Sequence, residues 1–381
     1  MRIAHSVIGS LLILGICAAL SCGGSGHSAA SGPSSEILYV LQSGTVTTYS
    51  VDPTSLTATP AEQPVALISP PDSVFQFDPS PHDNYLYTVW SDTQQVQHLS
   101  VFQNDSSGVP QLPAVQTIDA DSLSQFNMHP AGKFAYMLQS TVGTNGQYYS
   151  KIRLFAVKTA DGKLKENAQL QGTYGPAPFL PAILYGFSPD ASKLYVGMQS
   201  FTNSTYLQRA INSGTGTLGG TKQLIQLDPT EDVTIGSVIA VLHQGTGTSP
   251  EGYLDIFPNS PNPKRTVHCT TAMLSYCGSA TNVQLDRSGK FLFLTDPGTS
   301  AIHIARIGTA KHRLFDTGNS MPMTLQTPGF AFNRNGSIVY SMQTDGNLHF
   351  FHFGTGSGSL TEGGTPIPLA QGSGICPAQH Q

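Results

Sequence analysis

The chain has 381 residues with a formal net charge of −5, and only 11% of its residues are charged. Length alone would suggest two or three domains. The low charged fraction, together with 39 glycines, suits many short strands joined by tight turns, and it argues against a disordered chain or long amphipathic helices. There is no basic run, so a nucleic-acid partner has little electrostatic support.

The N-terminus has the pattern of an export signal. Arg2 precedes an apolar run from Val7 to Leu20, which is shorter than a typical membrane span. The run ends just before Cys22, where the sequence resembles a bacterial lipoprotein signal whose cysteine is lipidated; an ordinary secretory signal is the alternative. We expect an exported protein of the bacterial cell envelope (periplasm or outer membrane), anchored by a lipid on Cys22. The expected segments are a signal peptide, a flexible Gly/Ser-rich tether and one folded domain, at 1–21, 22–35 and 36–381.

A strand–turn–strand phrase recurs along the chain. Its clearest copy, VQLDRSGKFLFL, starts at Val283. In chain order the copies start at Phe75, Phe126, Tyr185, Val283 and Phe330, with spacings of 51, 59, 98 and 47 residues. Because 98 is twice 49, a degenerate copy is expected near Thr234. A four-stranded sheet repeated about every fifty residues is typical of a β-propeller.

The predicted fold is an all-β, seven-bladed β-propeller with four-stranded antiparallel blades. The first recognisable strands, 37–41 and 46–51, match the second and third strands of later blades, so the first blade lacks its innermost strand. We expect the tail around Gly372–Pro377 to supply it, which closes the ring by pairing the N- and C-terminal segments. Long insertions are expected to form loops on the faces of the ring, at Thr141–Ser150, Gln171–Pro181 and Gly245–Gly252.

One turn position of the repeat holds side chains that hydrogen-bond locally. The residues expected there are Asp78, His129, Ser188, Asp286 and Asn333. We therefore interpret His129 as a turn residue rather than a catalytic base. The recurring aromatic residues of the second strands, such as Tyr87 and Tyr136, are expected to pack between blades.

The cysteines indicate one disulfide. Cys269 and Cys277 are eight residues apart, and a local disulfide between them is the natural interpretation in an exported protein. His268 is adjacent, but a metal site has less support because no second pair of ligands is visible. Cys376 remains, in the predicted closing strand, where we expect a buried thiol; a nucleophile is the alternative, which no sequence signature supports.

The phrases SGKFLFLTDPGTSAIHIARI and ILYVLQSGTVTTYSVDPTSLTATP resemble the seven-bladed propeller family of 6-phosphogluconolactonase. The resemblance covers nearly all of the chain after the leader. It lies in the repeat length and in the pattern of strand and turn residues within each blade. It implies a channel between the innermost strands, with a lactone-hydrolysing site at one mouth.

Lactone opening needs a water activated by a base or a metal, and a donor for the developing oxyanion. The polar candidates are Asp72, Asp121, Arg209, Glu231, Asp232, His243, His268, Asn282 and Asp296. Glu231, Asp232 and Asn282 offer the oxygen ligands that calcium prefers, as in calcium-dependent propeller lactonases, and solvated loop charges are the alternative. No other cofactor is indicated.

Two functions remain open from the sequence. One is a lactone hydrolase, and the other is a non-catalytic propeller that binds a small molecule or a protein at one face, as a scaffold on the cell surface. Histidines and carboxylates that converge would favour the first, and a centre lined by Ser, Gln and aliphatic groups would favour the second. We expect a monomer that contacts the membrane only through its lipid.

Overall fold

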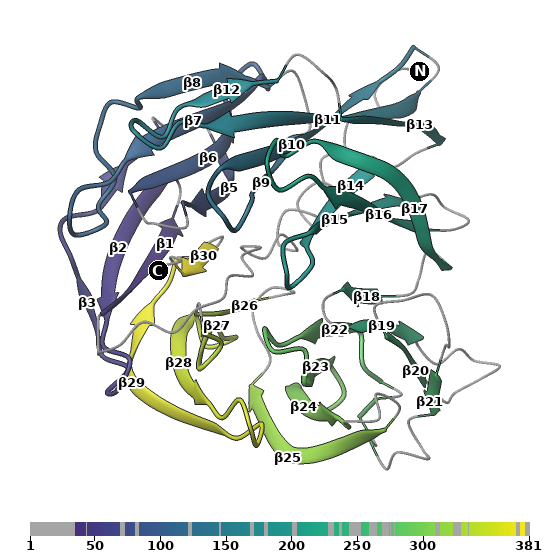
Figure 1. The fold of residues 1–381 in the computed structure, drawn as a ribbon. Helices are drawn as coiled ribbons and strands as arrows, with labels where there is room; N and C mark the ends of the chain where they lie inside the picture. Colours follow the sequence, from purple (N-terminus) through teal and green to yellow (C-terminus); the bar gives the residue numbers. More distant parts are fainter. Residues whose placement is uncertain are drawn as a thin grey trace, which may run out of the picture.

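The computed structural model describes residues 35–42, 44–68, 73–80, 84–120, 124–144, 146–167, 171–178, 182–199, 204–227, 232–235, 238–243, 253–258, 265–268, 274, 276–277, 279–308, 313–322, 329–333, 335–370 and 374–377. These residues form antiparallel sheets arranged as the blades of a propeller, which confirms the predicted fold class (Figure 1). None of them lies in a helix that is long and apolar enough to cross a membrane. The predicted signal peptide and tether lie outside the described residues.

Six blades are built from consecutive strands, each ordered from the innermost strand outward. The first consists of β5 (Ser73–Pro79), β6 (Tyr85–Ser91), β7 (Gln97–Gln103) and β8 (Gln116–Asp119). The next consists of β9 (Ser124–Met128), β10 (Phe134–Val142), β11 (Gln147–Val157) and β12 (Leu164–Glu166), with β13 (Gly172–Pro178) also paired to β11. The third consists of β14 (Ala182–Phe187), β15 (Lys193–Gln199), β16 (Ser204–Ile211) and β17 (Leu218–Leu227).

The remaining three contiguous blades follow the same order. One has β18 (Asp232–Ile235), β19 (Val238–His243), β20 (Tyr253–Pro258) and β21 (Arg265–His268). The next has β22 (Asn282–Leu285), β23 (Phe291–Asp296), β24 (Ala301–Ile307) and β25 (Leu314–Pro322). The last has β26 (Phe330–Phe332), β27 (Ile338–Met342), β28 (Asn347–Phe353) and β29 (Leu360–Pro368).

A composite sheet joins the two ends of the described chain. It contains β1 (Glu36–Gln42), β2 (Thr45–Val51), β3 (Ala58–Pro60) and β4 (Val65–Ala66), with β30 (Gly374–Pro377) paired antiparallel to β1 (Figure 1). Ring closure by the C-terminal tail is therefore confirmed. The predicted count of seven blades is not confirmed, since six blades are contiguous and this further sheet is shared by both ends.

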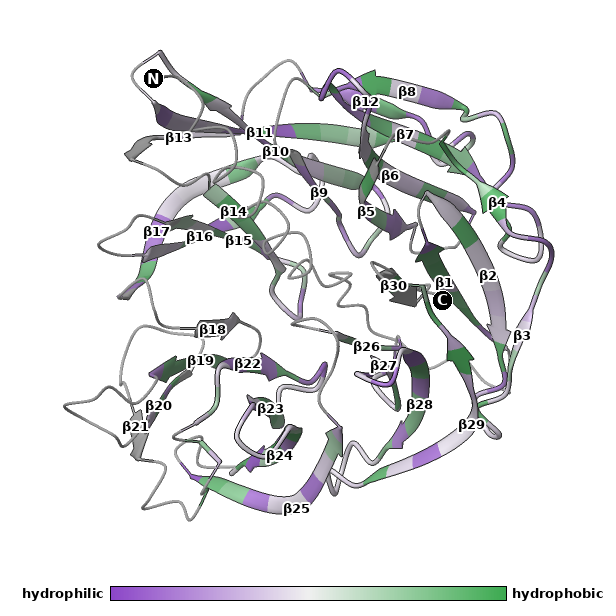
Figure 2. Ribbon diagram, turned by 180° about the vertical axis from the view of Figure 1, so that it is seen from behind, coloured by the Kyte–Doolittle hydropathy of each residue, from purple (hydrophilic) through white to green (hydrophobic). Residues whose placement is uncertain are grey.

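The core is distributed between blades. Along β1, Leu38 and Val40 pack toward β27 and β28, whereas Ile37 and Tyr39 pack toward β5 and β6. This alternation follows from the two-residue period of a strand, which sends successive side chains to opposite faces. Every residue of the outer strand β29 is exposed or half-buried, and Figure 2 shows purple bands on this strand where β1 is green.

Buried tyrosines connect each blade to the next. The hydroxyls of Tyr39, Tyr87 and Tyr136 donate to the carbonyls of Gly108, Gly162 and Gly216, at 3.0, 2.9 and 2.6 Å. Each glycine lies in the turn between the third and fourth strands of the following blade. Each also has a positive φ, between 66° and 77°, which favours glycine. The interpretation of these aromatic residues as blade packing is confirmed.

The predicted turn position is correct for four of its five residues. His129 accepts from the N–H of Ala131 through Nδ1 (3.1 Å), and so acts as a local turn acceptor. Asp78 was wrongly placed. Its turn is instead capped by Ser80, whose hydroxyl accepts from the N–H of Tyr85 at 3.1 Å. Asp78 lies two residues earlier, within β5, because Phe77 and not Phe75 is the residue equivalent to Phe126.

Two predicted loops are also corrected. The segment at 141–150 continues β10 and β11 as a longer hairpin, in which Thr141 lies opposite Tyr149. The segment at 171–181 contributes β13, which pairs with the end of β11 (Figure 1). The third predicted loop, at 245–252, lies outside the described residues.

Candidate functional site

Polar side chains on the innermost strands connect neighbouring blades. Gln76 hydrogen-bonds both the N–H and the carbonyl of Phe126 on the next innermost strand. Asp78 accepts from the N–H of Met128 at 3.0 Å. Two further contacts of this kind join Gln125 to the N–H of Leu184 and Thr234 to the N–H of Leu285. These side chains therefore hold the ring together and do not converge as an acid–base set.

Two adjacent blades carry a histidine–aspartate pair at the same place. His243 and Asp296 each end the second strand of their blade, β19 and β23. Their partners, Asp255 and His303, are each the third residue of the third strand. The distances from imidazole Nε2 to carboxylate Oδ2 are 3.1 Å in the first blade and 3.8 Å in the second. The two residue types exchange positions between the blades: the histidine ends the second strand in one blade, and the aspartate ends it in the other.

In the second of these blades, Thr299 links the two partners. Its hydroxyl donates to Asp296 Oδ2 at 2.7 Å and lies 2.8 Å from His303 Nε2. Because the hydroxyl has one proton and donates it to the carboxylate, it accepts from Nε2–H of the imidazole. That fixes the tautomer of His303 and leaves a lone pair on Nδ1. No hydrogen bond joins Nδ1 to any residue that the structure describes.

The carboxylate of this relay is buried and ionised. Asp296 is 1% exposed, and desolvation acts to raise its pKa. Hydrogen bonds from Ser279, Thr299 and the N–H of Gly298, with the nearby His303, outweigh that effect and hold the pKa of Asp296 below its usual value. A carboxylate in this state can orient an imidazole through the intervening hydroxyl and stabilise it when it gains a proton.

Tyr276 covers His303. The two rings are stacked with centroids 4.0 Å apart and an interplanar angle of 4°. The tyrosine hydroxyl donates to Asp316 Oδ1 on β25 at 3.2 Å. Burial, and then the charge and hydrogen bond of Asp316, raise the pKa of Tyr276, so its hydroxyl remains a donor. The neighbouring Cys277 is disulfide-bonded.

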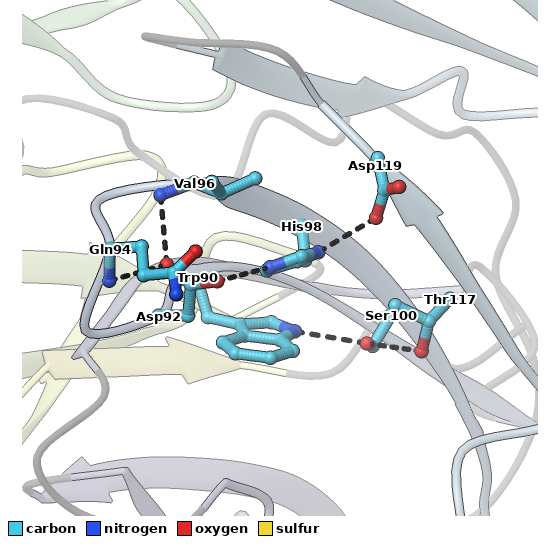
Figure 3. A network of polar contacts seen from close by, with 8 residues as sticks. All are labelled: Trp90, Asp92, Gln94, Val96, His98, Ser100, Thr117 and Asp119. Carbon is cyan, nitrogen blue, oxygen red and sulfur yellow. Dashed lines mark hydrogen bonds and ion pairs between the residues drawn. The ribbon is translucent and has the colours of Figure 1, made fainter.

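Two other histidines, His98 and His349, have both ring nitrogens occupied. Figure 3 shows His98 on β7, where Nδ1 lies 3.0 Å from Asp119 and Nε2 lies 3.3 Å from Asp92. The indole of Trp90 packs against this imidazole at a tilt of 31°, with ring centroids 4.4 Å apart, and its N–H donates to Ser100. His349 on β28 similarly contacts a turn aspartate and a glutamate of the outer strand. Neither imidazole has a free nitrogen for proton abstraction.

Arg209 has a structural environment. It is 8% exposed, and its guanidinium donates to the carbonyls of Gly219 and Gln171 and to the hydroxyl of Tyr174, at 2.7, 2.8 and 3.0 Å. These bonds tie β16 to its own outer strand and to β13 of the preceding blade. Arg209 is therefore far better placed to stabilise the interface between two blades than to bind an oxyanion.

The remaining candidates are only partly described. Asn282 begins β22, half-buried and opposite Thr295. Asp232 and His268 lie in β18 and β21, where only the backbone is described. Asp72, Asp121, Glu231, Cys22 and Cys269 lie outside the described residues, so the Cys269–Cys277 pairing and the calcium site stay predictions. Within the described part of the chain, no three His, Cys, Asp or Glu side chains are grouped to hold a metal.

Sequence reasoning identified Asp296 and His243 but missed their partners. His303 and Asp255 sit diagonally across a hairpin from them, a position where long side chains meet. The signal was present in the phrase TDPGTSAIH, since a tight turn after Asp296 brings the start of the next strand alongside it. Thr299 was missed because it lies within that turn.

Comparison with known proteins supports the fold. No family model and no curated protein sequence matches the chain. Among solved structures, a Bacteroides uniformis protein provisionally assigned as a 6-phosphogluconolactonase is 15% identical with a TM-score of 0.59, covering 90% of this chain and 99% of its own. The periplasmic gluconolactonase PpgL of Pseudomonas aeruginosa is 15% identical with a TM-score of 0.58 and the same coverage. Hydrazine synthase of Kuenenia stuttgartiensis is 14% identical with a TM-score of 0.51, covering 86% and 97%. The fold is thus lactonase-like and is shared by proteins with other activities.

Proposed function

We propose that this protein is an exported lactone hydrolase in which His303 is the general base. The observation that carries the proposal is the Asp296–Thr299–His303 relay, which leaves Nδ1 of a half-buried, oriented imidazole without a hydrogen bond to any described residue. The likeness in fold to structures of proteins named as gluconolactonases supports the choice of lactones as the substrate class. In this scheme His303, a described residue, supplies the base.

The reaction follows from the direction of the hydrogen bonds. His303 Nδ1 takes a proton from water as the water oxygen attacks the lactone carbonyl. Asp296, acting through Thr299, stabilises the imidazolium that forms. The tetrahedral intermediate then collapses with cleavage of the ring C–O bond, and the imidazolium returns its proton to the departing alkoxide. Lactone and water thereby give one hydroxy acid, and the base is regenerated.

The proposed location is the cell envelope. The leader and Cys22 support export and lipidation, and a gluconolactonase of similar fold in Pseudomonas aeruginosa is periplasmic. The lipid would be the sole membrane contact of a monomeric domain. Labelling of the expressed protein with a radioactive fatty acid tests this, with Cys22→Ser as the control: label that persists in the variant would refute lipidation at this cysteine.

A binding propeller is the second candidate function. It is favoured by the innermost strands, whose glutamine, threonine and aspartate side chains are engaged with neighbouring backbone groups. Such a ring would present a small molecule or a protein with a rigid face and perform no chemistry. This candidate predicts saturable lactone binding, or none, without acid release.

The two candidates are separated by acid release from a panel of sugar and aliphatic lactones. The protein would be the domain at 36–381, assayed with calcium and with a chelator. Our proposal predicts turnover that survives chelation and falls by about 10² or more in His303→Gln. Turnover abolished by chelation would overturn the metal-free base and direct attention to Glu231, Asp232 and Asn282. No turnover by the folded protein would leave the binding propeller as the better account.

A further inference from the structure

The segment that carries Tyr276 is anchored between two blades. Leu274, Tyr276, Cys277 and Ala280 are all at most 5% exposed. They pack in one hydrophobic cluster with side chains of β19 and β20 on one side and of β22, β23 and β24 on the other. The segment therefore belongs to the interface between the blade with His243 and the blade with His303.

Two side chains of this segment contact the relay directly. The ring of Tyr276 lies flat against the imidazole of His303. The hydroxyl of Ser279 donates to the carbonyl of Tyr276 at 3.2 Å, and the same side chain helps to hold the pKa of Asp296 below its usual value. Both ends of the relay are thus contacted by residues within three positions of Cys277, which is disulfide-bonded.

We propose that the described residues of this segment position the relay, with Tyr276 as the positioning residue, and that the disulfide at Cys277 keeps them in place, so that the site is competent only in the oxidised protein. This inference rests on the proposed function and adds its regulation. The protein would be inactive while its cysteines are reduced in the cytoplasm and would become active after export to an oxidising compartment.

The physical reason is the restriction of two motions. The stacked phenol blocks rotation of the His303 ring, and the hydrogen bond to Asp316 fixes the phenol itself. A disulfide reduces the conformations open to the segment that it closes. Reduction by a dithiol transfers two electrons and two protons to the bridge: the S–S bond breaks, two cysteine thiols form, and the reductant becomes a disulfide. The freed segment would then let the imidazole leave its orientation.

Substitution of Tyr276 tests the positioning role. In Tyr276→Leu we expect kcat to fall roughly tenfold with KM within about twofold, because the base is misoriented while substrate contacts remain. Tyr276→Phe keeps the ring and should retain most of the rate. Tyr253→Leu is the matched control, since Tyr253 stacks on His243 at the same 4.0 Å in the neighbouring blade. Equal rates in Tyr276→Leu and wild type would overturn the role of Tyr276.

Reduction tests the disulfide. The folded oxidised protein would be treated with dithiothreitol, with circular dichroism to confirm that the sheets persist, and then reoxidised. We expect loss of turnover on reduction, its return on reoxidation, and the same low activity in Cys277→Ser under both conditions. Full activity in the reduced, folded protein would overturn the proposal.

A readout without substrate separates this inference from the proposed function. The imidazole resonances of His303, assigned with His303→Gln, report its tautomer and its ring environment. They should shift on reduction and in Tyr276→Leu, and stay unchanged in Tyr253→Leu. If no lactone is turned over but these shifts occur, lactone hydrolysis fails while the positioning role stands. Unchanged resonances overturn the positioning role whatever the activity.

Discussion

Asp78 provides a prediction that can be worked from the structure. Its side chain is 3% exposed in β5, opposite Tyr87, and accepts one hydrogen bond from the N–H of Met128. Burial raises the pKa of Asp78 from 3.8 to about 7, and the single hydrogen bond only partly opposes this. In the next blade Asn127 holds the corresponding position, opposite Tyr136, so an amide fits this site.

The size of the effect follows from linkage. An acid whose pKa is raised on folding loses its proton first in the unfolded chain, so the free energy of unfolding falls as pH rises from about 4 to about 7 and is level above that. One pKa unit corresponds to about 1.4 kcal/mol. The shift of Asp78 therefore lowers stability by up to about 4 kcal/mol between those pH values. Asp78→Asn removes this dependence and should be the more stable protein at pH 8.

The assay is denaturant unfolding from pH 4 to pH 8. Trp90, the sole tryptophan, lies on β6 of the same blade and reports by fluorescence. We expect the stability difference between Asp78→Asn and wild type to grow in favour of the variant as pH rises. Asn127→Asp is the matched control and should lose stability with rising pH. A difference for Asp78→Asn that is constant over this pH range, or that shrinks, would refute the reasoning.

Three further changes test the fold and the assignment of roles. Truncation after Ala370 removes β30 and its pairing with β1, and should lower the free energy of unfolding by on the order of 3 kcal/mol in denaturant titrations; an unchanged midpoint would contradict ring closure. Tyr136→Phe leaves the carbonyl of Gly216 without its 2.6 Å donor and should lower the free energy of unfolding by about 1 to 2 kcal/mol. An unchanged free energy of unfolding would argue that this hydrogen bond does not stabilise the contact between the two blades. Arg209→Met removes three hydrogen bonds, and should lower the free energy of unfolding by about 3 kcal/mol and leave kcat/KM unchanged. A loss of activity without a loss of stability would restore Arg209 as a catalytic candidate.

The fold was predictable because each blade repeats one local pattern. Hydrophobic alternation, turn residues and a recurring tyrosine lie within about fifty residues, and they identified both the blades and the need for a strand from the C-terminus. Asp78 was misplaced because matching the letters aligned Phe75 with Phe126, whereas Phe77 is the equivalent residue, and this put the carboxylate where Ser80 lies. The extended hairpin of β10 and β11 was read as a loop because its polar residues resemble a turn.

The site was less predictable because its contacts cross strands. Asp296 was found as a polar residue at the end of a strand. His303 lies seven residues later on the next strand, where it reads as one of several half-buried polar residues in an alternating pattern. Tyr276 comes from a segment before the blade, and no local pattern connects it with His303. Which polar residues meet depends on the register of paired strands and on packing between blades.

The most direct test of the account compares kcat for wild type, His303→Gln and Thr299→Val on the best lactone of the panel. The account predicts a fall in kcat of about 10² or more for His303→Gln and a smaller fall for Thr299→Val, because Thr299 only orients the base. Wild-type kcat in His303→Gln would contradict the central claim that this imidazole activates water.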